Sequence, residues 1–171
     1  QYINADSGFY YFDENGYQKT GRVTSVECDD DDYTFYFNTK NGKNGQGYKG
    51  LKDDYLYFNG KKLTADDENR LYFYNDKIYL VNSKGKIQKG KKGYNIENSS
   101  ISEDKVSVEF NSDSSVKSIT LDEGKGTSYT AAQLLAMSLN TDSTTSDYVD
   151  EDGRYDDAYV TIPFIQLYDN N

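Results

Sequence analysis

The sequence of 171 residues contains no histidine, no tryptophan and a single cysteine, Cys28. Histidine is the commonest general base and the commonest neutral metal ligand, so its absence excludes Ser–His–Asp catalysis and histidine-based metal sites. One cysteine excludes an intramolecular disulfide and a multi-cysteine zinc site. Because no histidine can activate Cys28, its thiol is a poor candidate nucleophile. We therefore predict that the chain is not an enzyme and has no cofactor.

Long hydrophobic runs are also missing. The mean hydropathy is -0.92, and 28% of the residues are charged. No apolar run approaches the roughly 20 residues that a membrane helix requires, so we expect no membrane insertion. The sequence starts at Gln1 without an initiator methionine, and we expect it to be a segment of a larger parent polypeptide.

Aromatic residues supply much of the hydrophobic content, with 18 tyrosines and 8 phenylalanines. Tyrosine buries a large ring while its hydroxyl stays in contact with water. This composition suits a thin, repeated sheet that has no deep core.

Charge divides the chain near residue 95. Residues 1–95 carry 15 basic and 14 acidic side chains, whereas residues 96–171 carry 4 basic and 15 acidic ones. We predict two domains: an aromatic β-hairpin repeat region over residues 1–95, and an acidic α+β unit over residues 96–171. The near-neutral first region and the acidic whole argue against a nucleic-acid partner. The lysine-rich stretch 84–92 could meet an anionic wall polymer, but a solvated sheet edge is the favoured interpretation.

The opening stretch, residues 8–21, predicts a β-hairpin. Its aromatic run, residues 9–12, would alternate between the two faces of a strand. Asn15-Gly16 can supply the positive φ angles of a tight turn. The segment from Tyr79 to Gly90 aligns with Tyr10 to Gly21 without a gap. We therefore take the hairpin as a repeated unit.

Two further copies lie between these. The second, from Tyr33, carries one extra residue before its turn glycine Gly42, and the third turns at Asn59-Gly60. One register of the aromatic strand holds Tyr11, Tyr36, Tyr57 and Leu80, at spacings of 25, 21 and 23 residues. A period of this length indicates tandem hairpins that stack on their neighbours. We predict a mainly β fold in which tandem β-hairpin repeats form a solenoid-like stack or a meander sheet, followed by a small α+β C-terminal unit.

The copies resemble the cell-wall-binding repeat family of Gram-positive surface proteins. This family includes choline-binding repeats, glucan-binding repeats and the repetitive domains of large clostridial toxins. Its pattern is roughly aromatic-Tyr-Tyr-Phe-Asp-x-x-Gly-x-hydrophobic-x-x-Gly-Trp. Within residues 8–95, the matching positions are Phe9 to Asp13, Gly16 and Gly21 in the first copy, and Tyr79, Asn82, Gly85, Ile87 and Gly90 in the fourth.

The resemblance implies a non-catalytic, secreted or cell-surface module, from a Gram-positive bacterium, that binds a cell-wall polymer or an extracellular glycan. Arg22 and Lys91 replace the family's tryptophan, which argues against the aromatic cage that binds choline. Sugar rings can stack their C–H faces on exposed aromatic side chains instead. The candidate ligand-binding residues are Phe9, Tyr11, Tyr36, Tyr55 and Tyr57. The alternative is that these rings only cover a thin sheet, and that the repeats form a structural spacer or a protein-interaction (adhesion) segment.

The second half predicts a hairpin, one helix and a C-terminal strand. Residues 106–111 and 116–121 alternate as two strands. Thr130 and Gln133 form a capping box that begins a helix over about 130–140, packed through Leu134, Leu135 and Met137. Residues 159–168 would form the last strand, interrupted at Pro163. The acidic stretches 29–32 and 150–153 lack the ligand spacing of an EF-hand, so we predict solvated loops and no metal site.

Overall fold

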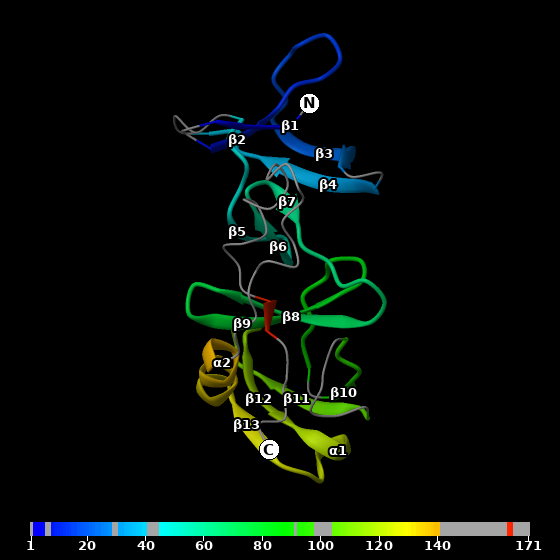
Figure 1. Cartoon of the computed structure of the whole chain (residues 1–171), viewed down its shortest axis with the longest axis vertical. Coiled ribbons are helices and arrows are strands. Elements are labelled where there is room, and N and C mark those ends of the chain that lie inside the picture. Colours follow the sequence, from blue (N-terminus) through cyan, green and yellow to red (C-terminus); the bar gives the residue numbers. More distant parts are fainter. Residues whose placement is uncertain are drawn as a thin grey trace. The chain divides into compact units, whose positions relative to one another are not determined.

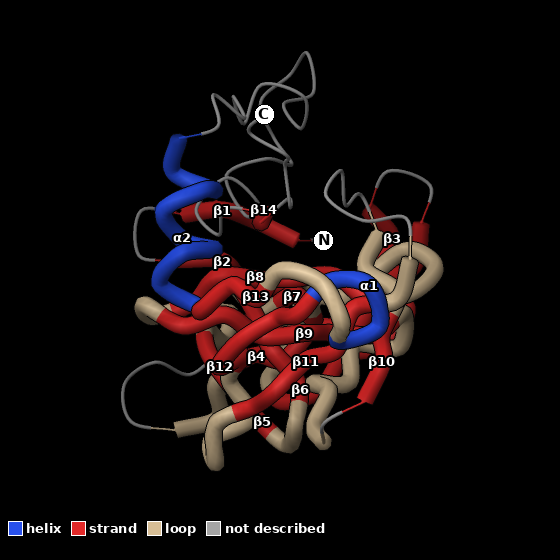
Figure 2. Tube along the Cα trace, turned by 90° about the horizontal axis from the view of Figure 1, so that it is seen from below, coloured by secondary structure: helices blue, strands red, loops and turns tan. Residues whose placement is uncertain are grey.

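The computed structural model describes residues 2–5, 8–28, 31–40, 45–90, 92–97, 104–140 and 164–165. Within these ranges the chain is mainly β, with antiparallel sheets and two short helices (Figure 1, Figure 2). The prediction of a mainly β chain is therefore confirmed. Two compact units divide the described residues between Leu63 and Thr64. Across the described part of the chain, no helix is long and apolar enough to cross a membrane.

The first unit contains two antiparallel sheets. Strands β1 and β2 form a two-stranded sheet, and the other five strands form a sheet in the order β3-β4-β7-β6-β5. The strands are β1 (Tyr2–Ala5), β2 (Gly8–Tyr11), β3 (Gly21–Cys28), β4 (Asp31–Phe37), β5 (Gly50–Lys52), β6 (Tyr55–Phe58) and β7 (Lys61–Lys62).

Two-residue turns with positive φ angles join the short strands of the five-stranded sheet. Asn59 and Gly60, with φ of 47° and 92°, connect β6 to β7. Asp53 and Asp54, with φ of 53° and 66°, connect β5 to β6. Such primed turns match the twist of antiparallel strands, and Asn, Asp and Gly tolerate their φ angles. The hairpin predicted at Asn59-Gly60 is confirmed.

The opening hairpin has a side-chain-capped turn rather than a two-residue turn. The Asp13 carboxylate accepts hydrogen bonds from the backbone N–H groups of Asn15 (3.0 Å) and Tyr17 (2.9 Å). Of the Asn15-Gly16 pair, only Gly16 has a positive φ, 81°. The predicted second strand is reduced to a single bridge between Phe12 and Gln18.

A matching turn occurs at Asn82, in the second unit. The Asn82 side-chain oxygen accepts hydrogen bonds from the N–H groups of Lys84 (3.0 Å) and Lys86 (2.9 Å), and Gly85 has a φ of 83°. Asn82 stands where the gapless alignment places Asp13. The two segments therefore share a turn as well as a sequence pattern.

The segment predicted as the second copy turns at Gly45. The Gly45 N–H donates to the Asn38 carbonyl (2.7 Å), just as the Gly16 N–H donates to that of Asp13 (3.0 Å). Gly45 has a φ of 80°. The predicted turn glycine, Gly42, lies outside the described residues. The hydrogen bond to Asn38 thus identifies Gly45, rather than Gly42, as the equivalent of Gly16. The stretch before the turn glycine is therefore longer than the sequence alone indicated.

A closed ring of three backbone hydrogen bonds lies at the centre of the five-stranded sheet. The Tyr36 N–H donates to Gly60, the Gly60 N–H to Tyr48, and the Tyr48 N–H to Tyr36, at 2.7, 2.9 and 2.9 Å.

Gly47 is packed directly against the β6–β7 turn. A Cβ added at Gly47 would lie 2.4 Å from the carbonyl carbon and oxygen of Asn59. Only glycine lets these segments approach so closely.

The second unit contains a four-stranded sheet, β10-β11-β12-β13, and a three-stranded sheet, β14-β8-β9. The strands are β8 (Asn69–Tyr74), β9 (Lys77–Asn82), β10 (Lys92–Tyr94), β11 (Val106–Phe110), β12 (Val116–Thr120), β13 (Ser128–Thr130) and β14 (Phe164–Ile165), and the helices are α1 (Leu121–Gly124) and α2 (Ala131–Asn140).

One hydrophobic core holds this second unit together and spans residue 95, the predicted domain boundary. Leu71, Ile78 and Leu80 of the β8–β9 hairpin are fully buried against residues of β11, β12 and α2. The hairpin therefore belongs with the acidic half of the chain rather than with the strands that precede it. The structure differs from the prediction here because apolar burial joins these elements, whereas composition and charge change after them.

The predicted hairpin at 106–121 and the predicted helix at about 130–140 correspond to β11–β12 and α2. The Gln133 N–H donates to the Thr130 hydroxyl (3.2 Å), and the Thr130 N–H donates to the Gln133 side chain (2.8 Å), which confirms the capping box. Leu134 is fully buried and Leu135 packs beside it. The Met137 side chain lies outside the described part.

Two differences concern the same half of the chain. The prediction had one helix, but α1 is a second helical element, in which Asp122 and Glu123 have positive φ angles of 49° and 56°. It is therefore an irregular turn rather than a right-handed helix. At the C-terminal end, β14 pairs with β8. The rest of the predicted final strand, residues 159–163 and 166–168, lies outside the described residues.

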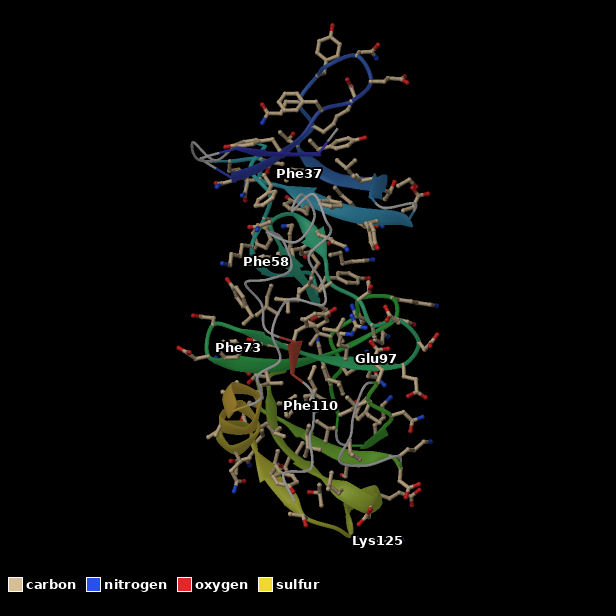
Figure 3. The ribbon with its side chains drawn as sticks, in the orientation of Figure 1. Phe37, Phe58, Phe73, Glu97, Phe110 and Lys125 are labelled. Atoms are coloured by element: carbon tan, nitrogen blue, oxygen red, sulfur yellow. The ribbon has the colours of Figure 1, made fainter. Side chains whose placement is uncertain are left out.

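Glu97, labelled in Figure 3, links the segment after β10 to the turn before β8. Its carboxylate accepts hydrogen bonds from the backbone N–H groups of Asp66 and Asp67, each at 3.0 Å, and pairs with the Arg70 guanidinium. Burial alone would raise the pKa of Glu97. The N–H groups of Asp67 and Asp66, together with Arg70, outweigh burial and lower the pKa below the usual 4.5.

Substitution of Gly47 should destabilise the first unit. We expect Gly47→Ala to lower the free energy of unfolding by about 1–3 kcal/mol, because the added methyl group would displace the Asn59 backbone. Urea denaturation followed by tyrosine fluorescence measures this change. Gly93→Ala is the matched control, since a Cβ there meets Lys105 side-chain atoms at an ordinary 3.5 Å. Equal effects of the two substitutions would contradict the expectation.

Loss of the Glu97 carboxylate should weaken the second unit in a pH-dependent way. A lowered folded-state pKa gives stability that is present above pH 4.5 and is lost as the pH falls below it. At pH 7, Glu97→Gln should therefore cost about 1–3 kcal/mol of unfolding free energy. At pH 3, its difference from the wild type should shrink.

Urea denaturation at both pH values tests this expectation for Glu97. Glu109→Gln is the control, because the Glu109–Lys117 pair is exposed and 3.3 Å long and should contribute less than about 1 kcal/mol. A Glu97→Gln deficit that is the same at pH 7 and pH 3 would refute the assignment.

Candidate functional site

One face of the five-stranded sheet gathers tyrosine and basic side chains from every strand. Residues paired across antiparallel strands share a face, and neighbours along a strand alternate. The paired residues are Arg22 with Tyr36, Tyr57 with Lys62, and Lys52 with Tyr55. We call this surface the aromatic–basic face; it comprises Arg22, Tyr36, Tyr48, Lys52, Tyr55, Tyr57 and Lys62.

Three tyrosine rings at the centre of this face contact one another. The Tyr36 and Tyr48 ring centroids are 5.7 Å apart at an interplanar angle of 87°. Tyr57 lies 6.0 Å from each of the two, tilted at 55° to Tyr36 and at 82° to Tyr48. Edge-to-face contacts of this kind stabilise aromatic pairs and fix the orientation of the rings. The Tyr48 hydroxyl donates to the Leu51 carbonyl (2.9 Å), which orients that ring further.

Two lysines of the aromatic–basic face lie over tyrosine rings of the same face. The Lys52 ammonium is 4.6 Å from the Tyr36 ring centroid and 6.0 Å from that of Tyr48. The Lys62 ammonium is 5.0 Å from the Tyr55 centroid. An ammonium over an aromatic ring is attracted by the negative face of the π system. The face therefore presents fixed positive charges beside its rings.

Arg22 adds a third positive charge to the face. Burial, and then the nearby Arg22 guanidinium, lower the pKa of Lys62. Burial raises the pKa of Tyr57, and Arg22 opposes this rise more strongly than Asp53 adds to it. Asp53, in the β5–β6 turn, is thus an acidic group near the face, but the positive charge dominates at its centre.

The opposite face of the same sheet is a core. Val26, Phe35 and Phe37 are almost fully buried there (Phe37 is labelled in Figure 3), with Tyr11, Val23 and Tyr33 packed around them. The buried Lys61 ammonium lies 3.4 Å from the Tyr33 ring centroid on this side. By contrast, Tyr36, Tyr48 and Tyr55 are only partly buried.

Three of the five candidate residues lie together on the aromatic–basic face: Tyr36, Tyr55 and Tyr57. Tyr57 is only 5% exposed, so its ring supports Tyr36 and Tyr48 from below. The other two candidates, Phe9 and Tyr11, are elsewhere. Phe9 is 8% exposed, and Tyr11 stacks on Phe37 at 6.2 Å in the core of the opposite face. Their shared register did not place them with the other candidates, because β2 pairs with β1 in a separate sheet.

Sequence reasoning missed Tyr48 and the basic residues of the face. Tyr48 is the one aromatic residue between Asn38 and Tyr55, in a glycine-rich stretch that looked degenerate. An alignment of the second copy on Gly45 instead of Gly42 would have placed Tyr48 opposite Lys19 of the first copy. Both residues pair with the preceding aromatic strand. The Lys19 N–H donates to the Tyr11 carbonyl, and the Tyr48 N–H donates to the Tyr36 carbonyl, each at 2.9 Å.

No group of three or more cysteine, aspartate or glutamate side chains that could hold a metal ion occurs within the described ranges. Of the two acidic stretches considered for calcium, residues 150–153 lie outside the described part, as do Asp29 and Asp30. Asp31 and Asp32 belong to β4 rather than to a loop.

No protein-family model matches the chain, and no curated protein is similar enough to it to count as a relative. The resemblance to cell-wall-binding repeats therefore stays a prediction from the sequence motifs.

Removal of Arg22 should change the titration of Lys62. Burial lowers the pKa of Lys62 most and the Arg22 guanidinium lowers it further, so Arg22→Gln should raise that pKa part of the way toward its ordinary value of 10.5. A pH titration of lysine side-chain carbon resonances measures the shift. Lys49→Gln is the control, since the Lys49 ammonium lies over the Phe58 ring. An unchanged Lys62 titration in Arg22→Gln would contradict this picture of the face.

Proposed function

We propose that the chain is a non-catalytic, extracellular module that binds a cell-wall polymer or glycan through the aromatic–basic face of its first unit. The observation that carries this proposal is the cluster of Tyr36, Tyr48 and Tyr57, in which each ring contacts the other two. The partly buried tyrosines Tyr36 and Tyr48, together with Tyr55, form the surface on which a sugar would stack.

Rigid rings suit this role because little freedom remains to be lost on binding. Each side chain that becomes ordered in a complex costs about 0.5–1.5 kcal/mol. Here the ring contacts, the Tyr48–Leu51 hydrogen bond and the lysines over the rings already hold the orientations. The surface is also one face of a sheet, which can take a polymer without enclosing its end.

Repetition of one turn supports the interpretation of tandem hairpins. In three turns, a glycine N–H donates a hydrogen bond to the carbonyl of the residue that starts the turn. The bonds run from Gly16 to Asp13 (3.0 Å), from Gly45 to Asn38 (2.7 Å) and from Gly85 to Asn82 (2.9 Å). At Asn111 the same bond comes from Ser114 (3.0 Å), whose φ is 69°. We infer that the hairpins that turn at Asp13, Asn38, Asn82 and Asn111 are copies of one unit, although the last lies in the acidic half of the chain. This inference and the sequence motifs together support a secreted or cell-surface location on a Gram-positive bacterium.

The second candidate is a structural spacer or protein-interaction segment. Burial of Phe9 and Tyr57, and the position of Tyr11 in a core, favour it, because these aromatic residues of the repeats pack the sheets. The partly buried tyrosines Tyr36, Tyr48 and Tyr55, which lie beside basic residues, favour the binding function over this alternative.

Glycan arrays, with pull-down on purified peptidoglycan and wall polysaccharide, test the binding function. Dissociation constants for retained ligands should rise roughly tenfold, equivalent to about 1.4 kcal/mol, in Tyr36→Ala and in Tyr55→Ala. Circular dichroism should show that each variant keeps its β structure.

Tyr17→Ala is the matched control for these substitutions. Tyr17 is 71% exposed on the opening turn and belongs to no cluster of the aromatic–basic face. Its removal should leave binding unchanged. Failure of the wild type to bind any glycan or wall fraction would refute the function, and equal losses in all three variants would refute the site.

A further inference from the structure

We propose that the saccharide bound by the aromatic–basic face is anionic and carries carboxylate or phosphate groups. This inference rests on the proposed function and names the ligand class for the same site. It commits the face to one occupant, a polymer with negative charge along its chain.

Charge complementarity is the first argument. Arg22, Lys52 and Lys62 project from three different strands onto the same face. Arg22 and Lys62 are close enough for one cation to disfavour the other. Neighbouring like charges cost free energy in the unbound protein, and a bound anion would relieve that cost. Arginine and lysine are also the side chains that pair best with carboxylates and phosphates.

The placement of cations beside rings is the second argument. Lys52 lies over Tyr36, and Lys62 lies over Tyr55. An acidic sugar combines an apolar C–H face with a charged group at its edge, so one residue of the polymer can contact a ring and an ammonium together. A quaternary ammonium ligand does not fit, because the positive charges of Lys52 and Lys62 beside these rings would repel it.

Asp53 allows a second test, because it is an acidic residue near the face whose removal should have the opposite effect. It lies in the β5–β6 turn, next to Lys52, and acts on Tyr57 against Arg22. Its φ of 53° belongs to a primed turn, a position in which asparagine is favoured. Asp53→Asn should therefore keep the fold, remove a negative charge from the rim of the face and tighten the binding of an anionic polymer.

The test compares three polymers of similar length by biolayer interferometry with the full chain. Polygalacturonate supplies carboxylates, a poly(glycerol phosphate) supplies phosphodiesters, and dextran is neutral. We expect binding to at least one anionic polymer to be roughly tenfold tighter than to dextran, and to weaken as salt rises from 50 to 500 mM. The two anionic arms show which charged group is preferred.

Charge variants assign the effect to the face. Arg22→Gln and Lys62→Gln should each weaken anionic binding several-fold, whereas Asp53→Asn should strengthen it. Lys84→Gln and Lys89→Gln remove exposed charges from the other lysine-rich stretch and should have no effect. Far-UV circular dichroism of each variant checks the fold.

Different outcomes would contradict the anionic ligand and the glycan-binding function. Equal binding of dextran and the anionic polymers, or a loss of binding in Lys84→Gln and Lys89→Gln instead of the face variants, would overturn the anionic ligand while the glycan-binding function stands. Binding of none of the polymers, together with an empty glycan array, would overturn both.

Discussion

The first unit depends on three backbone hydrogen bonds that close on one another between Tyr36, Tyr48 and Gly60. They join β4, the segment that follows the Gly45 turn and the β6–β7 turn, which are separate in sequence. Because each donor and acceptor is a main-chain group, the ring fixes positions independently of the side chains that project from it. Two of its three members are tyrosines, so the same bonds that hold the sheet also bring the Tyr36 and Tyr48 rings to 5.7 Å. The same three hydrogen bonds therefore hold the sheet together and position two rings of the candidate site.

The sequence predicts local structure here better than it predicts assembly. Turns were readable because asparagine, aspartate and glycine have backbone preferences that act over a few residues, as at Asn59-Gly60. The capping box at Thr130 was readable for the same reason. The domain boundary was not, because the apolar residues of β8 and β9 pack with residues of β11 and β12 that lie from 26 (Leu80 to Val106) to 48 (Leu71 to Ile119) positions away. No local preference encodes that choice.

The candidate site was readable only in part. Aromatic alternation identified Tyr36, Tyr55 and Tyr57, since they share the register of strands in one sheet. It also named Phe9 and Tyr11, although β2 belongs to another sheet, because a periodic pattern does not say which strands pair. The basic residues went unnoticed for a different reason. Arg22, Lys52 and Lys62 are unremarkable in a chain with 19 basic side chains, and only strand pairing shows that they share a face with the tyrosines.

The turn that recurs at Asp13, Asn38, Asn82 and Asn111 closes over segments of different length. Its bridging hydrogen bonds close in the same way whether the glycine position is reached after three residues, as at Gly16, or after seven, as at Gly45. Each of these two turns is flanked by a single bridge, between Phe12 and Gln18 or between Phe37 and Gly47. The turn at Asn38 thus has four more residues before its glycine than the turn at Asp13, and Phe37 still bridges Gly47.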